Sequence, residues 1–212
     1  MNVGILGSGV VGQALGFGFL QAGHVVKIGT RDPGKLKDWI AKAGTQASTG
    51  TVAETAAFGE LIVLATKWDG TEAVIRAADP AQLAGKVVID TTNPLDFSHG
   101  PPPRLALGHS DSAGEQVQRW LPKARVVKAF NIVGNAHMVQ AQFPGGPPDM
   151  FICGNDADAK KTVFDICTTF GFVTTDLGGI ENARYLEPMA MVWIAYGFRH
   201  NTWNHAFKLL HK

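Results

Sequence analysis

The amino-acid sequence predicts an α/β protein built on a doubly wound, mostly parallel sheet, with a small helical part at the C-terminus. Short apolar runs alternate with helix-like segments at the spacing of strand–helix–strand units, which join parallel strands by right-handed crossovers. Glycines directly follow the first apolar run, where such a strand turns into its helix. With 212 residues, the chain can bury one core of this kind and an extension, but not two large domains.

The N-terminal segments show this alternation most clearly. Residues 2–6 are apolar and end in glycines, which is typical of a strand buried on both faces, and the segment after them is expected to be helical through residue 22. Residues 25–28 predict the second strand. A helix over residues 33–43 is expected next, with Asp32 as its N-cap and a proline at its first position.

Later segments continue the pattern and then change it. Residues 61–65 and 86–90 predict two more buried strands, and a helix over residues 113–121 leads to a strand at 125–128. Beyond residue 134 a loop rich in proline and glycine comes first. A strand, a helix, a strand and a final apolar segment are then expected at residues 150–153, 157–170, 172–175 and 186–196.

Composition argues against several classes of protein. A formal net charge of +1 with 17% charged residues provides no broad basic surface for nucleic acid. No apolar run is long enough to span a bilayer and the first residues do not resemble a signal peptide, so we expect a cytoplasmic protein without a membrane segment. Cys153 and Cys167 stand in apolar surroundings and are expected to be small buried residues, rather than a disulfide or metal ligands.

The glycines near the N-terminus form the most specific motif, G-x-G-x-x-G at residues 7–12. Between a strand and a helix, this motif is the fingerprint of a dinucleotide-binding, Rossmann-like domain. Gly7 permits the tight turn, Gly9 lets the backbone approach the pyrophosphate, and Gly12 lets helix and strand pack closely. The helix N-terminus adds free N–H groups and a partial positive charge. The residues expected to bind the pyrophosphate are therefore Gly7, Ser8, Gly9, Val10, Val11 and Gly12.

The end of the second strand indicates which dinucleotide is bound. NAD-binding domains have an acidic residue there that binds the ribose 2′-hydroxyl, whereas this chain has Thr30 and Arg31. A hydroxyl and a guanidinium suit the 2′-phosphate of NADP(H), and Arg31 can also stack on the adenine. Asp32 is the alternative ribose ligand, but its place before a proline favours the N-cap. We therefore expect NADP(H), held here by Thr30, Arg31 and Lys35.

Polar residues follow three of the predicted strands, at the edge where ligands bind in open α/β sheets. We expect Thr66, Asn93 and Asn131 to hydrogen-bond the nicotinamide ribose or amide, with Pro94 shaping the turn. The alternative is that these side chains satisfy only the local backbone. The whole set expected at this end of the cofactor is Ala65, Thr66, Lys67, Asn93, Pro94 and Asn131.

No acid–base or metal site is recognisable in the sequence. The histidines lack metal-ligand spacing, and surface positions are expected for His99, His109, His200, His205 and His211. Hydride transfer to a redox ring depends on alignment and exclusion of water more than on an acid or a base. The expected acceptor lining is flat and poor in ionisable groups, with Trp68, Asn131 and Val133 as its members and Pro94 beside them. It favours hydride exchange between NADP(H) and a planar ring over reduction of a small hydroxy acid.

The whole chain resembles the family of NADP oxidoreductases that act on the deazaflavin coenzyme F420. The resemblance runs from the glycine motif and Gly29-Thr30-Arg31 to residues 152–156 and 177–184. It implies a Rossmann-like domain with a small C-terminal part, a dimer, and a hydride acceptor against the nicotinamide in the cleft between the two parts. We accordingly divide the chain into an NADP-binding domain, residues 1–134, and a part that closes the acceptor cleft, residues 135–212.

Residues 111–115 and 126–131 are similar to a second family, the cytosolic oxidoreductase domain of the STEAP metalloreductases, which pass electrons from NADPH to a flavin. In two places the chain departs from the deazaflavin enzymes. Asn131 stands where those enzymes tend to have a histidine, and the proline-rich loop 96–110 has no clear counterpart in them. The expected acceptor is therefore coenzyme F420 or a flavin (FAD or FMN), and the alternative is a ferric or flavin reductase of the STEAP type.

Other functions are also compatible with the glycine motif. Hydroxyacid dehydrogenases and imine reductases share the nucleotide-binding half, but they append a longer helical domain for which the residues after Gly178 leave little room. A non-catalytic NADP-sensing module would keep the cofactor residues without an acceptor site. Residues 186–196 are apolar nearly all round and are expected to pack in a homodimer interface, unless the helix is buried within one chain.

Overall fold

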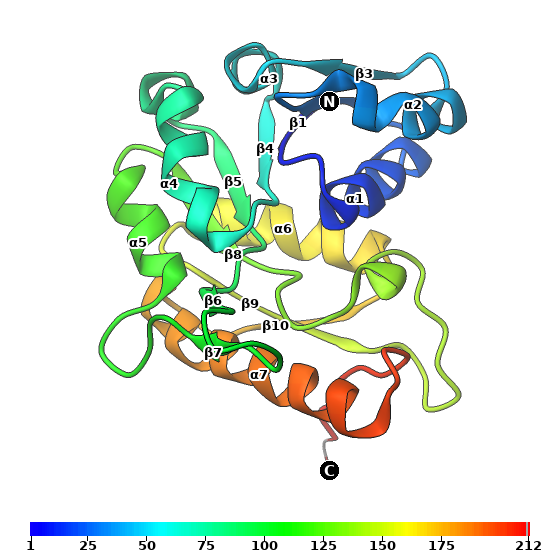
Figure 1. The fold of residues 1–212 in the computed structure, drawn as a ribbon, viewed down its shortest axis with the longest axis vertical. Coiled ribbons are helices and arrows are strands. Elements are labelled where there is room, and N and C mark those ends of the chain that lie inside the picture. Colours follow the sequence, from blue (N-terminus) through cyan, green and yellow to red (C-terminus); the bar gives the residue numbers. More distant parts are fainter. Residues whose placement is uncertain (211) are drawn as a thin grey trace.

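The computed structural model describes residues 1–210 and 212, in which an eight-stranded sheet lies between two layers of helices (Figure 1). The strands are β1 (Asn2–Leu6), β2 (Val25–Gly29), β3 (Ala47–Gly50), β4 (Leu61–Leu64), β5 (Val87–Asp90), β8 (Arg125–Lys128), β9 (Asp149–Gly154) and β10 (Val173–Asp176). Their order across the sheet is β10-β9-β8-β5-β4-β1-β2-β3. Neighbouring strands are parallel, except that β9 pairs antiparallel with β8.

The parallel strands β3-β2-β1-β4-β5-β8 have the order of a Rossmann fold, which confirms the predicted fold class. The chain reverses direction across the sheet between β1 and β4, and ligands of such sheets bind at this switch point. β4 and β5 are buried throughout, because helices cover both faces of the sheet, and their sequences are apolar except for Asp90 at the end of β5.

The helices form two layers, one on each face of the sheet (Figure 1). One layer contains α1 (Val10–Gln21), α2 (Lys37–Ala43) and α6 (Ala157–Thr169), and the other contains α3 (Val52–Phe58), α4 (Trp68–Ala77) and α5 (Ala113–Trp120). Aromatic rings join neighbours within each layer. Phe17 of α1 packs on Trp39 of α2 at 5.4 Å between ring centroids, and Trp68 stacks on Trp120 at 5.5 Å. Short 3₁₀ turns lie at Pro33–Leu36, Pro80–Leu83, Asn135–His137 and Ile180–Asn182.

The predicted helix over residues 33–43 is a 3₁₀ turn followed by α2, and its N-cap is confirmed because the Asp32 carboxylate accepts the Gly34 N–H at 3.0 Å. The segment 44–60, to which the sequence analysis assigns no element, forms β3 and α3. A capping box begins α3, in which the Thr51 hydroxyl accepts the Glu54 N–H and the Glu54 carboxylate accepts the Thr51 N–H.

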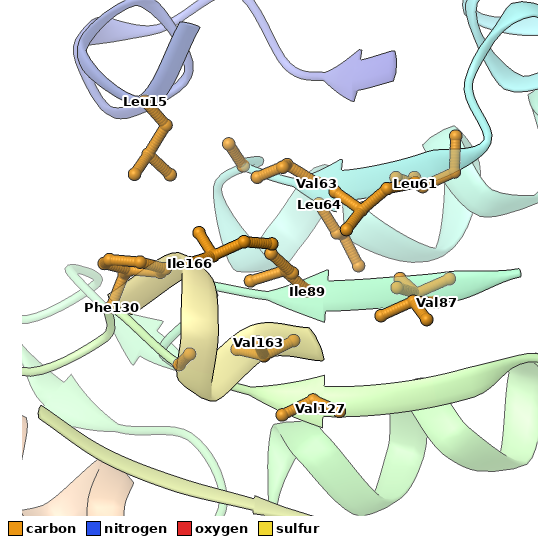
Figure 2. Packing of buried hydrophobic residues seen from close by; sticks show 14 of the residues in the cluster. Leu15, Leu61, Val63, Leu64, Val87, Ile89, Val127, Phe130, Val163 and Ile166 are labelled. Carbon is orange, nitrogen blue, oxygen red and sulfur yellow. The ribbon is translucent and has the colours of Figure 1, made fainter. Parts of the chain in front are cut away.

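Buried apolar side chains from the strands and from α1 and α6 form one continuous core. Figure 2 shows Leu15 of α1 and Ile166 of α6 directed toward Ile89 of β5. The predicted burial of both cysteines is confirmed. Burial raises the pKa of the Cys153 thiol to about 12 and also raises the pKa of Cys167, so both thiols stay protonated at neutral pH.

The strands after residue 134 extend the same sheet, and the last helix, α7 (Ala183–His200), lies beside a two-stranded hairpin of β6 (Leu95–Asp96) and β7 (Arg104–Leu105) (Figure 1). The chain therefore continues its core past residue 134, and the division there stays a prediction. No helix among residues 1–210 and 212 is both long and apolar enough to cross a membrane.

Only one side of α7 is buried within the chain. Leu186, Ala190 and Ile194 face the interior, whereas Tyr185 and Val192 have exposed fractions of 70% and 60%. The apolar segment predicted over residues 186–196 is thus part of a helix with a buried side and an exposed apolar side.

Candidate functional site

The glycine-rich turn between β1 and α1 has the backbone that its sequence predicts. Gly7 has a φ of +128°, and a Cβ there would lie 2.2 Å from the Ala65 carbonyl oxygen. A Cβ on Gly12 would lie 2.2 Å from the Gly7 carbonyl oxygen, so the helix could not approach the turn as it does. A Cβ on Gly9 would meet nothing within 4 Å. Gly9 is the N-cap of α1, and no side chain among the described residues caps this helix. The unpaired N–H groups at the N-terminus of α1 therefore face the open space beside Gly9.

The end of β2 is joined to this turn through Thr30. The buried Thr30 hydroxyl lies 3.1 Å from the Ser8 hydroxyl and accepts the Asp32 N–H at 3.1 Å. Arg31 and Lys35 are exposed beside it, and Arg31 forms no salt bridge to the described residues. The cations expected to bind a 2′-phosphate are therefore available to solvent next to the turn.

A cavity of about 620 Å³ lies between the turn and the loops after β4 and β5. Gly9 lines it on one side and Asn93 on the other. The expected cofactor residues that line it are Gly9, Val10, Val11, Ala65, Thr66, Lys67 and Asn93. The others do not line it: Gly7, Ser8 and Gly12 lie in the turn, Thr30, Arg31 and Lys35 after β2, Pro94 is buried behind the loop, and Asn131 lies in the loop after β8.

A second cavity, of about 510 Å³, lies between the loop after β8, α7 and the β6–β7 hairpin. Asn131 and Val133 line it, as expected of acceptor residues. Trp68 lines the first cavity instead, where it stacks on Trp120. Sequence reasoning missed most of the second lining, which is apolar and aromatic and includes Leu95, Phe97, Ala190, Trp193, Ile194, Phe198 and Trp203.

The two cavities share a wall formed by Val11, Asn93, Leu95 and Phe97. Phe97 is 58% exposed at the hairpin, so its ring borders both cavities from the solvent side. The proline-rich loop 96–110 singled out in the sequence thus contributes to the boundary between them. This arrangement allows two ligands to meet at one edge of the sheet.

Asn93 and Asn131 bind each other at that boundary. The Asn93 side-chain amide donates to the Asn131 carbonyl oxygen at 2.7 Å, and the Asn131 amide donates to Asn93 Oδ1 and to the Leu186 carbonyl oxygen, each at 3.0 Å. Asn131 Oδ1 is buried and has no hydrogen-bond partner among the described residues. A buried amide oxygen without a donor costs about 1–3 kcal/mol.

A buried cluster of charged side chains, also missed by sequence reasoning, lies beneath this boundary. Lys128 Nζ is 2.9 Å from Asp90 Oδ2 and 2.8 Å from Glu187 Oε1, and all three side chains are at most 2% exposed. Burial by itself would lower the pKa of Lys128, but the carboxylates of Asp90 and Glu187 outweigh it and raise that pKa. A signal was present in the sequence, because Asp90 and Lys128 end apolar strands and Glu187 is the one charged residue of the segment 186–196.

The histidines are placed mostly as expected. His99, His109 and His200 are exposed, and His211 lies outside the described residues. The expectation is wrong for His205, which is half-buried, with its ring 4.7 Å from that of Trp193 and its Nε2 bound to the Trp193 carbonyl oxygen. The segment after α7 folds back onto the helix, which could not be seen from the sequence. No group of three or more His, Cys, Asp or Glu side chains in the described part of the chain is placed to hold a metal ion.

Comparisons with known proteins identify the family to which the chain is similar. Residues 2–94 match the family model described as NADP oxidoreductase coenzyme F420-dependent. A crystal structure of a candidate F420-dependent NADP reductase from Arthrobacter sp. FB24 is 38% identical, and the alignment covers 100% of both chains with a TM-score of 0.94.

Two relatives represent the two families that the sequence resembles. The metalloreductase STEAP3 of Rattus norvegicus is 31% identical over 193 residues, which are 90% of this chain and 36% of the metalloreductase. This chain therefore spans about a third of that relative. The F420-dependent NADP reductase of Methanocaldococcus jannaschii is 28% identical over 95% of both chains. The chain thus belongs to the family of coenzyme F420-dependent NADP oxidoreductases and is related also to the STEAP metalloreductases.

Proposed function

We propose that this protein transfers hydride between NADP(H) and a planar redox ring, with the deazaflavin coenzyme F420 as the preferred acceptor. The wall shared by the two cavities carries the proposal. Hydride transfer requires the donor carbon and the acceptor atom to approach within about 3–3.5 Å, which is possible only where two binding sites are contiguous. Val11 and Asn93 belong to both linings and would touch both ligands.

The residues around the first cavity fit NADP(H). The uncapped N-terminus of α1 and the open space above Gly9 suit a pyrophosphate, which would fill the volume that a side chain would otherwise occupy. Arg31 and Lys35 provide charge for the 2′-phosphate. Asn131 Oδ1, which lacks a donor among the described residues, suits an amide N–H of the nicotinamide.

This chain's own residues align the two ligands and exclude water. Bound NADPH supplies the hydride. The Asn93–Asn131 pair fixes two loops relative to each other at the shared wall. Apolar side chains of α7 and the hairpin surround the acceptor position, so that little water reaches the reacting atoms.

The chemistry of the second cavity favours a flat, uncharged ring as acceptor. Phe97, Trp193, Phe198 and Trp203 provide ring faces and edges for stacking, and among residues 1–210 and 212 no Lys, Arg, His, Asp or Glu side chain lines the cavity. A small carbonyl or imine substrate would need an acid to protonate it, and the described lining provides none. Coenzyme F420 is favoured by the match to the Arthrobacter structure along the entire chain.

A flavin is the second candidate. The 31% identity to the rat metalloreductase over 90% of this chain favours it. Asn131, the last residue of the segment 126–131 that resembles the STEAP domain, also lines the second cavity.

The proposal is tested by single-turnover absorbance of NADPH with coenzyme F420, FMN, FAD and a ferric chelate offered separately. We expect rapid reduction of a ring, fastest for coenzyme F420, and no reaction in a Gly9→Val variant that cannot bind the cofactor. Faster reduction of FMN or FAD would favour the STEAP type of reaction. Reduction of a small imine or carbonyl but of no ring, or NADPH binding without any reduction, would refute the proposal, and the latter would indicate an NADP sensor.

We also propose that the protein is a homodimer that pairs the exposed side of α7. Tyr185, Val192 and Tyr196 lie along this side, about two turns and then one turn apart, and are 70%, 60% and 46% exposed. None of the three is an Asp, Glu, Lys or Arg residue, so a two-fold contact between identical copies would bring no like charges of these residues together.

A further inference from the structure

The buried Lys128 makes more contacts than an ion pair needs. Besides Asp90 and Glu187, its ammonium donates to the Thr92 carbonyl oxygen at 2.6 Å. An ammonium group has three N–H donors, and each therefore has one acceptor at hydrogen-bond distance. The side chain is 0% exposed, so no water shares these bonds and the direction of each is set by protein atoms.

Each carboxylate of the cluster is held by further donors. Asp90 Oδ1 accepts the Thr92 N–H at 2.9 Å and the Thr92 hydroxyl at 2.7 Å. Glu187 accepts the N–H groups of Ala113 and Gly114, both at 2.9 Å, and so occupies the N-terminus of α5. The cluster therefore joins β5, β8, α5 and α7 in one polar network.

The network reaches both walls of the proposed reaction site. On one side, Thr92 lines the first cavity and precedes Asn93 of the shared wall. On the other side, Glu187 lies about one turn before Ala190 and about two turns before Ile194, and both of these residues line the second cavity. Asn131 makes a parallel link, because its amide donates to the carbonyl oxygen of Leu186, next to Glu187. The loop beside the proposed nicotinamide position and the helix beside the proposed acceptor are thus tied to the same ammonium group.

We propose that Lys128 is a positioning residue that sets the separation between the cofactor and the acceptor ring by tying the Thr92–Asn93 loop to helix α7. An apolar side chain could fill the same buried space, but it could not bind the Thr92 carbonyl or the Glu187 carboxylate. Removing one charge of a buried cluster costs stability, so the effect on the geometry of the reaction site has to be measured in variants that stay folded. The expected change in the rate of hydride transfer rests on the proposed function, whereas the link between the loop and the helix does not depend on it.

The first test compares Lys128→Met with Lys86→Met. Lys86 is a matched control, because it is a partly buried lysine that donates to the Ala56 carbonyl oxygen at 2.7 Å and lines neither cavity. The rate of hydride transfer is measured in single turnover, once with unlabelled NADPH and once with NADPH deuterated at the transferred position. We expect Lys128→Met to slow this rate by about tenfold to a hundredfold and to show the full isotope effect. The Kd for NADPH should change by less than about threefold, since the pyrophosphate and 2′-phosphate contacts stay intact.

A second variant covers the case in which two uncompensated carboxylates unfold the protein. Lys128→Met with Glu187→Gln removes one buried charge, and Asp90 keeps its two bonds from Thr92. Hydrogen exchange by mass spectrometry provides a readout that needs no acceptor. We expect faster exchange in residues 91–94 and 186–190 together in either variant, and not in Lys86→Met.

Several results would overturn the inference. In the kinetic test, these are an unchanged rate of hydride transfer or a loss of rate that weaker NADPH binding fully explains. In the exchange test, the contrary result is unchanged exchange in either of the two segments. Failure of both variants to fold would show that the cluster is purely structural. If the wild-type protein reduces no ring, the proposed function fails, and the exchange experiment still tests whether Lys128 ties the loop to the helix.

Discussion

Gly9→Val should abolish NADPH binding without unfolding the protein. Gly9 has a φ of −74° and a ψ of 178°, which is extended backbone that any residue adopts, and a Cβ there meets no atom within 4 Å. The change in the free energy of unfolding should therefore stay within about 0.5 kcal/mol. The new side chain would stand in the cavity lined by Gly9, where we place the pyrophosphate. We expect NADPH binding to weaken at least about a hundredfold, or about 2.7 kcal/mol.

Gly12→Ala is the contrasting variant within the same motif. Its Cβ would lie 2.2 Å from the Gly7 carbonyl oxygen, whereas real Cβ atoms essentially never come closer than 3.0 Å. The turn and α1 must therefore separate by about 0.8 Å, and overpacking of this kind costs about 1–3 kcal/mol. Gly12→Ala should thus lower both stability and binding, whereas Gly9→Val should lower binding alone.

Urea unfolding and titration of NADPH fluorescence measure the two quantities for each variant. Tight binding by Gly9→Val would refute the assignment of the pyrophosphate to this turn. A large loss of stability in Gly9→Val, comparable with that in Gly12→Ala, would refute the argument from open space.

Other predictions concern separate parts of the molecule. Arg31→Ala should weaken NADPH binding by about 1.5–3 kcal/mol and leave NADH binding nearly unchanged in parallel titrations, and equal losses would contradict a 2′-phosphate contact. Phe97→Ala should raise the KM for the ring acceptor by about tenfold while the Kd for NADPH changes little, whereas an effect on NADPH alone would mean that the ring serves only the cofactor cavity. Val192→Lys should shift sedimentation equilibrium from dimer to monomer, and a wild-type monomer at micromolar concentration would argue against the α7 interface. Arg184 hydrogen-bonds Glu115 and holds its pKa below the ordinary value of 4.5, so this pair should stabilise the fold above pH 4.5 and lose that effect as the pH falls through the lowered pKa. Urea unfolding of wild type and Glu115→Gln should accordingly converge once the pH lies below the lowered pKa of Glu115, and a stability difference that stays constant as the pH falls from neutrality through this range would contradict the assignment.

Local patterns were sufficient to predict most elements of the fold. The apolar runs that became β1, β4, β5 and β8 are short and bounded by turn residues, because strands covered on both faces have no polar side. The start of α3 was also visible as the capping-box pattern Thr51-x-x-Glu54, although the sequence analysis did not use it. β3 remained hidden because it is an edge strand, half-buried along its length, and its residues Ala47–Gly50 are not strongly apolar.

The sequence by itself determined the glycine-rich turn, because the need for glycine at Gly7 and Gly12 arises within a single strand–turn–helix unit. Only the tertiary structure decided which distant side chains meet beneath the reaction site. Asp90, Lys128 and Glu187 come from two strands and a helix far apart in the chain, and their contact depends on β5 and β8 being neighbours in the sheet and on α7 crossing the ends of both. The same long-range packing brings α7 and the β6–β7 hairpin together around the acceptor cavity. Each of these contacts requires the closure of a long loop of chain, and the pattern of neighbouring residues therefore contains no direct record of it.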